Sequence, residues 1–212
     1  MKIIKKIQRN KLYLDNEEIM DVSPLIRQKY NLKVNDDIES LYDDISYEAS
    51  LEKGIFIISL KDRTKKELQT KLNEKYFNTK MVQKAVQKLE ELGYINDLDY
   101  TISYINNRKY GKNRISYNLF QKGINRETID KAYNIIEEEI EKNIEDRKLE
   151  KAILKHRKKL LVDDEEKDTS LEGKMKRLKE EQKVIQSLAR QGFEIEKIFS
   201  KLKEFKESGF EE

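Results

Sequence analysis

The sequence predicts a mainly α-helical protein: an elongated array of three tandem three-helix modules behind a small β-containing N-terminal cap. Two observations support this fold class. One pattern of apolar residues recurs three times after residue 60, and its spacings of three and four place the apolar side chains on one helix face. Charged residues make up 40% of the chain and hydrophobic residues 37%. This balance suits thin helical layers that each bury one stripe, rather than one thick core.

The first 45 residues differ from the rest and form the predicted cap. The stretches KIIKKIQ and KLYLDNEEIMDV are typical of short strands, with a turn at residues 15–16 between two of them. Ser23 and Pro24 are typical of a helix N-cap and of the first helical position. A further turn in NLKVNDD is expected to lead into a helix that begins near Asp36.

The internal repeat is anchored on Phe77, Ile124 and Phe193. Apolar residues stand nine and five positions before each anchor, and five, nine and twelve positions after it. These flanking residues are Leu68, Leu72, Val82, Val86 and Leu89 in the first copy, Ile115, Leu119, Ile129, Tyr133 and Ile136 in the second, and Val184, Leu188, Ile198, Leu202 and Phe205 in the third. The same packing unit is therefore predicted three times.

Each copy is predicted to be a helical hairpin. Gly123 and Gly192 suit the end of a first helix, and Asn78 and Asn125 suit the cap of the next one. The segment before each hairpin supplies a third helix, at residues 45–60, 98–110 and 145–161. The predicted domains are a cap at 1–45 and repeats at 46–95, 96–140 and 141–212. The last repeat carries an acidic insertion near residues 163–173, which we expect to be a loop.

The composition argues against catalysis and against a cofactor. The chain has no cysteine, and its single histidine, His156, lies in KHRKK without a second histidine or a carboxylate relay. The acidic run DDEE lacks the glycine and ligand order of a calcium loop, and no phosphate-binding Gly-Lys-Ser/Thr loop is present. We expect no enzymatic activity, no metal and no cofactor.

The chain is expected to be cytoplasmic, monomeric and not bound to a membrane. No apolar run approaches the about 18 residues that a spanning helix needs, and the N-terminus does not resemble a signal peptide. The absence of a sustained heptad pattern favours a monomer.

Three ordered motifs resemble the RecX family, regulators of the bacterial RecA recombinase. They are Arg63-Thr64-Lys65-Lys66-Glu67-Leu68, then Gly93-Tyr94-Ile95-Asn96-Asp97, and finally Gly111-Lys112 followed by Lys122-Gly123-Ile124. The family usually has Ser where Thr64 stands and Asp where Asn96 stands. The resemblance covers about residues 46–212 and is strongest at 60–136; the first 45 residues resemble a β-containing segment of some longer members. It implies a non-enzymatic modulator that lies along the groove of the RecA–single-stranded DNA filament. There it would suppress ATP hydrolysis and strand exchange.

Recurring basic residues are the candidate binding site for RecA or DNA. Lys65 and Lys112 occupy equivalent repeat positions, as do Lys75 and Lys122, and such recurrence would draw a basic line along one side of an array. The complete candidate set is Arg63, Lys65, Lys66, Lys75, Arg108, Lys109, Lys112, Arg114 and Lys122, with Tyr110 and Tyr117 as candidates for stacking on bases. The third copy has Glu181 and Gln191 at the repeated lysine positions, so the line is not expected to continue there.

Two other interpretations stay open. The chain can be a single-stranded nucleic-acid-binding protein that acts without RecA, which predicts salt-sensitive affinity for bare DNA. It can also be a helical protein–protein adaptor, in which the basic runs at 61–88, 100–126 and 147–159 are only solvated helix faces.

Overall fold

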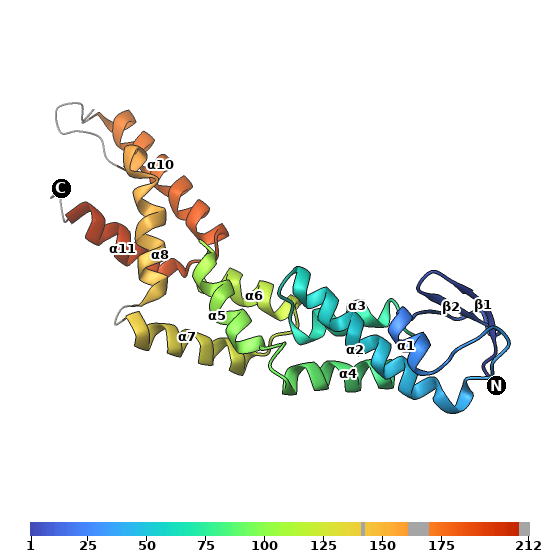
Figure 1. Cartoon of the computed structure of the whole chain (residues 1–212). Coiled ribbons are helices and arrows are strands. Elements are labelled where there is room, and N and C mark those ends of the chain that lie inside the picture. The colour runs from blue at the N-terminus through green and yellow to red at the C-terminus, as the bar shows by residue number, and fades with distance from the viewer. Residues whose placement is uncertain (141–142, 161–169, 208–212) are drawn as a thin grey trace. The chain divides into compact units, whose positions relative to one another are not determined.

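The computed structural model describes residues 1–140, 143–160 and 170–207. The chain divides into two compact units (Figure 1). Unit 1 contains Met1–Tyr100 together with the short segment Lys122–Ile124, and unit 2 contains Thr101–Gln121 and Asn125–Glu212. The predicted fold class, mainly α with a small β-containing cap, is confirmed.

Unit 1 begins with an antiparallel sheet of three short strands in the order β1-β2-β3. The strands are β1 (Ile4–Gln8), β2 (Lys11–Leu14) and β3 (Ile19–Asp21), and Leu12 pairs with Met20. Helix α1 (Pro24–Lys29) follows, and Ser23 caps it by accepting a hydrogen bond from the Ile26 N–H, as expected. A 3-10 turn, η1 (Glu39–Leu41), precedes the first long helix, which begins at Tyr42 rather than near Asp36.

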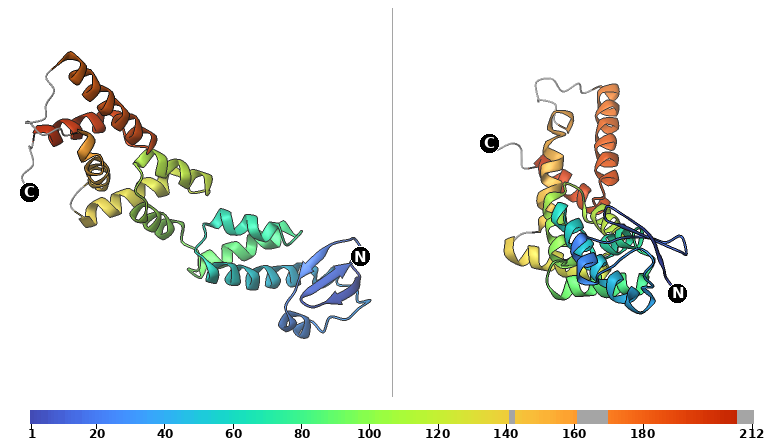
Figure 2. Two further views of the ribbon diagram at one scale, coloured as in Figure 1. Left: turned by 90° about the horizontal axis from the view of Figure 1, so that it is seen from above. Right: turned by 45° about the vertical axis from the view of Figure 1, so that its right-hand side comes forward.

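Three helices complete unit 1 and pack side by side (Figures 1 and 2). They are α2 (Tyr42–Leu60), α3 (Lys65–Asn73) and α4 (Thr79–Glu91). The sheet and these helices share one hydrophobic core, in which Leu12, Ile45 and Leu89 are all fully buried. The close packing of α2 on α4 depends on Gly54, because a Cβ atom there would lie 2.6 Å from Leu89 Cδ1.

Unit 2 consists of helices. Helix α5 (Asp97–Asn107) enters it at Thr101, and α6 (Lys112–Gln121), α7 (Arg126–Ile140), α8 (Ile144–Leu154), α9 (Arg157–Leu160), α10 (Leu171–Arg190) and α11 (Ile195–Glu207) follow. Helices α8, α10 and α11 enclose a core that includes Leu149, Leu188 and Ile198.

The apolar repeat is confirmed with one exception. Of the seventeen anchor and flanking positions other than Phe77, sixteen are buried and one, Phe205, is half-buried. Phe77 itself is 72% exposed, so the prediction that it anchors the first copy is wrong. The adjacent Tyr76 is buried instead, because its hydroxyl donates to the carbonyl oxygens of Asp21 and Ala49 at 3.0 and 3.1 Å.

The acidic insertion near residues 163–173 is only partly described. Helix α10 begins at Leu171 and is capped by Ser170, whose Oγ accepts from the Gly173 N–H at 3.0 Å. The last three residues of the expected loop are therefore helical, and residues 163–169 lie outside the described residues.

Candidate binding surfaces

The predicted basic residues of unit 1 differ in how they are engaged. Lys65 forms an ion pair with Glu90 at 2.5 Å, and the half-buried Lys122 forms one with Glu67 at 2.5 Å. Lys66 and Lys75 are exposed, while Arg63 is half-buried. The recurring lysine Lys122 thus contributes to the packing of unit 1 as well as to its charge.

Thr64 explains why Lys122 is held in this position. Its hydroxyl accepts a hydrogen bond from the Glu67 N–H at 3.2 Å and donates to the carbonyl oxygen of Lys122 at 2.6 Å. Glu67 completes a capping box by accepting from the Thr64 N–H at 3.3 Å. Burial raises the pKa of Glu67, but the hydrogen bonds from Lys122 and Thr64 outweigh it and hold the pKa below its usual value.

Most of the predicted basic residues of unit 2 lie against aromatic rings. Arg108 lies 4.9 Å from the centre of the Tyr104 ring, and Lys112 lies 4.7 Å from that of Tyr133. Arg114 lies 4.0 Å from the Tyr110 ring, so one face of this candidate stacking residue is covered by a guanidinium group. The other candidates, Lys109 and Tyr117, are exposed.

The two equivalent lysines Lys65 and Lys112 share a backbone arrangement. Each lies in the first turn of a helix, α3 or α6, where backbone N–H groups lack partners within the helix. The N–H of Lys65 donates to Asp97 Oδ1 at 2.9 Å, and the N–H of Lys112 donates to Glu145 Oε1 at 3.2 Å. A carboxylate therefore caps the same helix start in two copies of the repeat.

A basic cavity of about 710 Å³ in unit 2 joins two predicted residues to a group that the candidate set left out. Arg108 and Lys109 directly follow α5. The other basic residues of the cavity belong to α8, except Lys155, which directly follows it. The basic residues that line it are Arg108, Lys109, Arg147, Lys148, Lys151 and Lys155, and none of its lining residues in the described part of the chain is acidic. The basic run at 147–159 was the signal in the sequence for this group.

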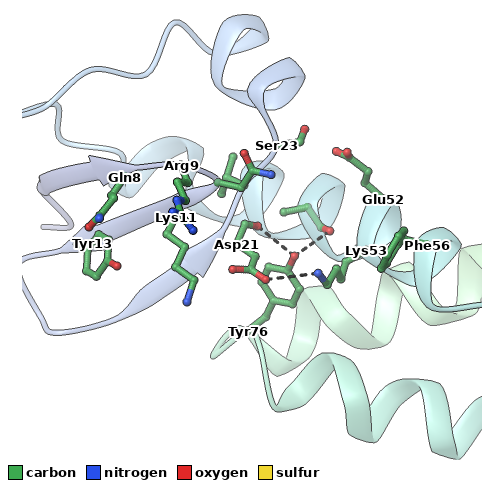
Figure 3. A pocket seen from close by; sticks show the side chains of 13 residues that line it. Gln8, Arg9, Lys11, Tyr13, Asp21, Ser23, Glu52, Lys53, Phe56 and Tyr76 are labelled. Carbon is green, nitrogen blue, oxygen red and sulfur yellow. Dashed lines mark hydrogen bonds and ion pairs between the residues drawn. The ribbon is translucent and has the colours of Figure 1, made fainter.

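A second cavity, of about 660 Å³, lies in unit 1 between the sheet and α2 (Figure 3). Figure 3 shows Gln8, Arg9, Lys11 and Tyr13 on the side of the sheet and Glu52, Lys53 and Phe56 on α2. Tyr76 and Asp21 lie between them, and Asp21 forms an ion pair with Lys53 at 3.6 Å. Nothing in the sequence pointed to this cavity, because the strands and the helix that line it are far apart along the chain.

Comparison with known proteins identifies the family. A family model described as "RecX, second three-helix domain" matches residues 96–132. The regulatory protein RecX of Clostridium beijerinckii is 31% identical over 144 residues, which cover 65% of this chain and 68% of that protein. The chain belongs to the RecX family. The RecX of Clostridioides difficile is 29% identical over 157 residues, which cover 66% of this chain and 74% of that protein.

Solved RecX structures share the fold. A crystal structure of regulatory protein RecX aligns with a TM-score of 0.58 and 22% identity, and the alignment covers 96% of this chain and all of that one. The crystal structure of RecX from Lactobacillus salivarius aligns with a TM-score of 0.57, also at 22% identity, over 74% of this chain and 97% of that one.

The residues that resemble the RecX motifs have structural roles in this chain. Thr64 and Glu67 form the capping box described above. Gly93 has a positive φ of 76° just after α4, and the neighbouring Ile95 is buried in the core of unit 1. Gly111 lies against the backbone of Gly192, where a Cβ atom would be 2.3 Å from the carbonyl oxygen. These RecX motifs therefore mark helix ends and close backbone contacts.

The described helices offer no membrane span: none is both long enough and apolar enough. In residues 1–140, 143–160 and 170–207, no group of three or more His, Cys, Asp or Glu side chains is arranged to hold a metal ion.

Proposed function

We propose that this chain is a regulator that binds the RecA–single-stranded DNA filament and inhibits its ATP hydrolysis and strand exchange through contacts, without chemistry of its own. Membership of the RecX family, whose relatives are named regulatory proteins, is the observation that carries the proposal. The choice of RecA as partner rests on the family resemblance of the motifs in residues 60–124.

Exposed cations supply the surface chemistry that such binding requires. A filament of recombinase on single-stranded DNA is polyanionic where the DNA backbone is accessible, and lysine and arginine side chains lower the free energy of contact with phosphates. Lys66 and Lys75 in unit 1 and Lys109 in unit 2 are exposed, and no carboxylate among the described residues forms an ion pair with them. We assign the first contact with the filament to these residues.

Sedimentation with preformed filaments tests the proposal. The full chain is mixed with the cognate RecA on single-stranded DNA, with RecA alone and with DNA alone, and the pelleted chain is quantified. The proposal expects most of the chain in the filament pellet. Recovery with DNA alone at the same level would favour a nucleic-acid-binding protein that acts without RecA, and no recovery in any pellet would favour an adaptor for another partner.

A charge variant assigns the surface. The double variant K66Q/K75Q removes two exposed cations from unit 1 and should reduce recovery with the filament. The variant K80Q/K84Q removes two exposed cations from α4 in the same unit and serves as the matched control. Equal recovery of the two variants would overturn the assignment to Lys66 and Lys75.

A further inference from the structure

The basic cavity of unit 2 has a charge that the described residues leave uncompensated. Six of its twelve lining residues are lysine or arginine. No ion pair in the described part of the chain involves any of these six side chains, whereas Lys197, Lys201 and Lys206 elsewhere in unit 2 all have carboxylate partners. Like charges gathered on a concave surface repel one another, and an anion placed among them lowers that energy.

Helix α8 separates its charges onto different faces. Each residue of a helix is rotated by about 100° from the one before it. Viewed along the axis, four basic residues therefore fall within an arc of about 100°: Arg147, Lys148, Lys151 and, if the rotation is continued past the end of α8, Lys155. The acidic residues Glu145 and Glu150 lie outside this arc and pair with Lys197 and Lys201 of α11, at 2.7 and 3.1 Å. Two of the three carboxylates of α8 thus pair with α11, and Arg147, Lys151 and Lys155 have no ion-pair partner among the described residues.

Lys148 supports this description of the site. Burial lowers the pKa of its ammonium group to about 8, against an opposing effect of the nearby Glu145, and its Nζ donates to the carbonyl oxygen of Ile105. The chain therefore holds a partly desolvated amine beside Arg147 and Lys151, where a bound anion would favour its charged form.

The spacing of the charges and the lining of the cavity favour a nucleic-acid strand over other anions. Arg147, Lys151 and Lys155 are spaced four residues apart, or about 6 Å per step along a helix, which suits a row of charges rather than one. A nucleic acid supplies one phosphate per nucleotide whatever its sequence, whereas an acidic peptide must carry its charges at particular positions. Amide and apolar side chains also line the cavity, namely Asn106, Asn107, Gln191, Ile144, Ala152 and Leu154, and they suit the edge of a base and a sugar.

We propose that this cavity binds the phosphodiester backbone of a single-stranded nucleic acid, with Arg108, Arg147 and Lys151 contacting its phosphates. The inference deepens the proposed function, because it names the part of a RecA–DNA filament that unit 2 contacts. Its test uses DNA without RecA, so that either idea can fail without the other.

Fluorescence anisotropy with a labelled oligothymidylate and the full chain measures the binding. The test variant is R147Q/K151Q, and the matched control is K174Q/K179Q, which removes two exposed cations from α10 of the same unit. All four side chains are exposed, so neither variant should disturb the fold, and circular dichroism melting checks this. Each lost phosphate contact lowers the slope of log K against log salt by about 0.7 for single strands.

The expected result is a salt slope lower by about 1.4 for R147Q/K151Q, with roughly tenfold weaker binding at moderate salt, and no change for the control. Absence of binding by the wild-type chain, or equal losses in both variants, would overturn the proposal. Displacement of the oligonucleotide by polyglutamate at equal charge concentration would reassign the cavity to an acidic protein segment, and displacement by millimolar inorganic phosphate would reduce it to a single-anion site. Both outcomes contradict the proposal.

Lysine acetylation gives an independent readout. At pH 8, a brief treatment with acetic anhydride modifies deprotonated amines, and mass spectrometry reports the extent at each lysine. Bound oligonucleotide should protect Lys148, Lys151 and Lys155, while Lys174 and Lys179 react equally with and without it. Uniform protection of all five, or of none, would contradict the assignment. A wild-type chain that inhibits RecA but shows no measurable affinity for the oligonucleotide would overturn this inference and leave the proposed function standing.

Discussion

The backbone contact between Gly111 and Gly192 gives the sharpest prediction about unit 2. The Gly111 N–H donates to the Gln191 carbonyl at 3.0 Å, and the Asn113 N–H donates to the Gly192 carbonyl at 3.3 Å. A Cβ atom at position 111 would lie 2.3 Å from the Gly192 oxygen and 2.5 Å from the Phe193 nitrogen, well inside ordinary contact distance. The substitution G111A must therefore push two backbone segments apart.

The expected cost follows from these contacts. Losing two hydrogen bonds costs about 1 kcal/mol each, and overpacking against backbone adds about 1–3 kcal/mol. Alanine also lowers the conformational entropy of the unfolded chain, which stabilises the folded state by about 0.4–1 kcal/mol. We therefore expect G111A to lower the free energy of unfolding of unit 2 by about 3 kcal/mol.

Gly93 offers a matched control. Its φ of 76° is unfavourable for alanine, but no atom lies within 4 Å of the position that a Cβ would take. The variant G93A should therefore lower the free energy of unfolding of unit 1 only by the cost of a positive φ for alanine, about 1–2 kcal/mol.

Hydrogen exchange measured by mass spectrometry separates the two effects, because it reports each unit by its own peptides. G111A should increase exchange in α6, α8 and α10 and leave α2 to α4 unchanged. If G111A destabilises unit 2 no more than G93A destabilises unit 1, the reasoning from close backbone contact is refuted.

Three further predictions concern single side chains. T64V, which loses both hydroxyl hydrogen bonds, should destabilise unit 1 by about 1–2 kcal/mol in urea denaturation, whereas T64S should stay near wild type; equal effects would contradict the cap. Y76F should cost about 1–3 kcal/mol, because it leaves the Asp21 and Ala49 carbonyls without this donor, and an unchanged melting temperature would refute that role. The folded pKa of Lys148, about 8, lies below the unfolded value of about 10.4, so the unfolded chain binds more protons between these values. Stability of the wild type relative to K148M should therefore rise from pH 8 to pH 10, and a flat difference would contradict the lowered pKa.

Local chemistry made much of the fold predictable. The caps at Ser23 and Asn78 accept the expected backbone hydrogen bonds, and Gly123 and Gly192 adopt the positive φ that suits a helix end. These features depend on residues within a few positions of one another, so the sequence pattern contains the information.

Contacts between distant residues were harder to predict. The sequence cannot tell which of two adjacent aromatic residues turns inward, and Tyr76 does so because its hydroxyl meets Asp21, 55 positions away. The repeat position of Lys122 was visible in the sequence. Its ion pair with Glu67 was not, because this pair also joins residues 55 positions apart. The basic run at 147–159 was visible too, and its unpaired state became clear only once α8 was seen to turn Glu150 toward Lys201.

The central claim is that the chain inhibits the RecA filament, and single-stranded-DNA-dependent ATP hydrolysis by the cognate RecA tests it most directly. The full chain is titrated into preformed filaments at near-physiological salt, with a parallel measurement of its binding to the same DNA without RecA. We predict that hydrolysis falls at a chain concentration well below that needed to cover the DNA. Hydrolysis that stays unchanged at saturating chain would contradict the account.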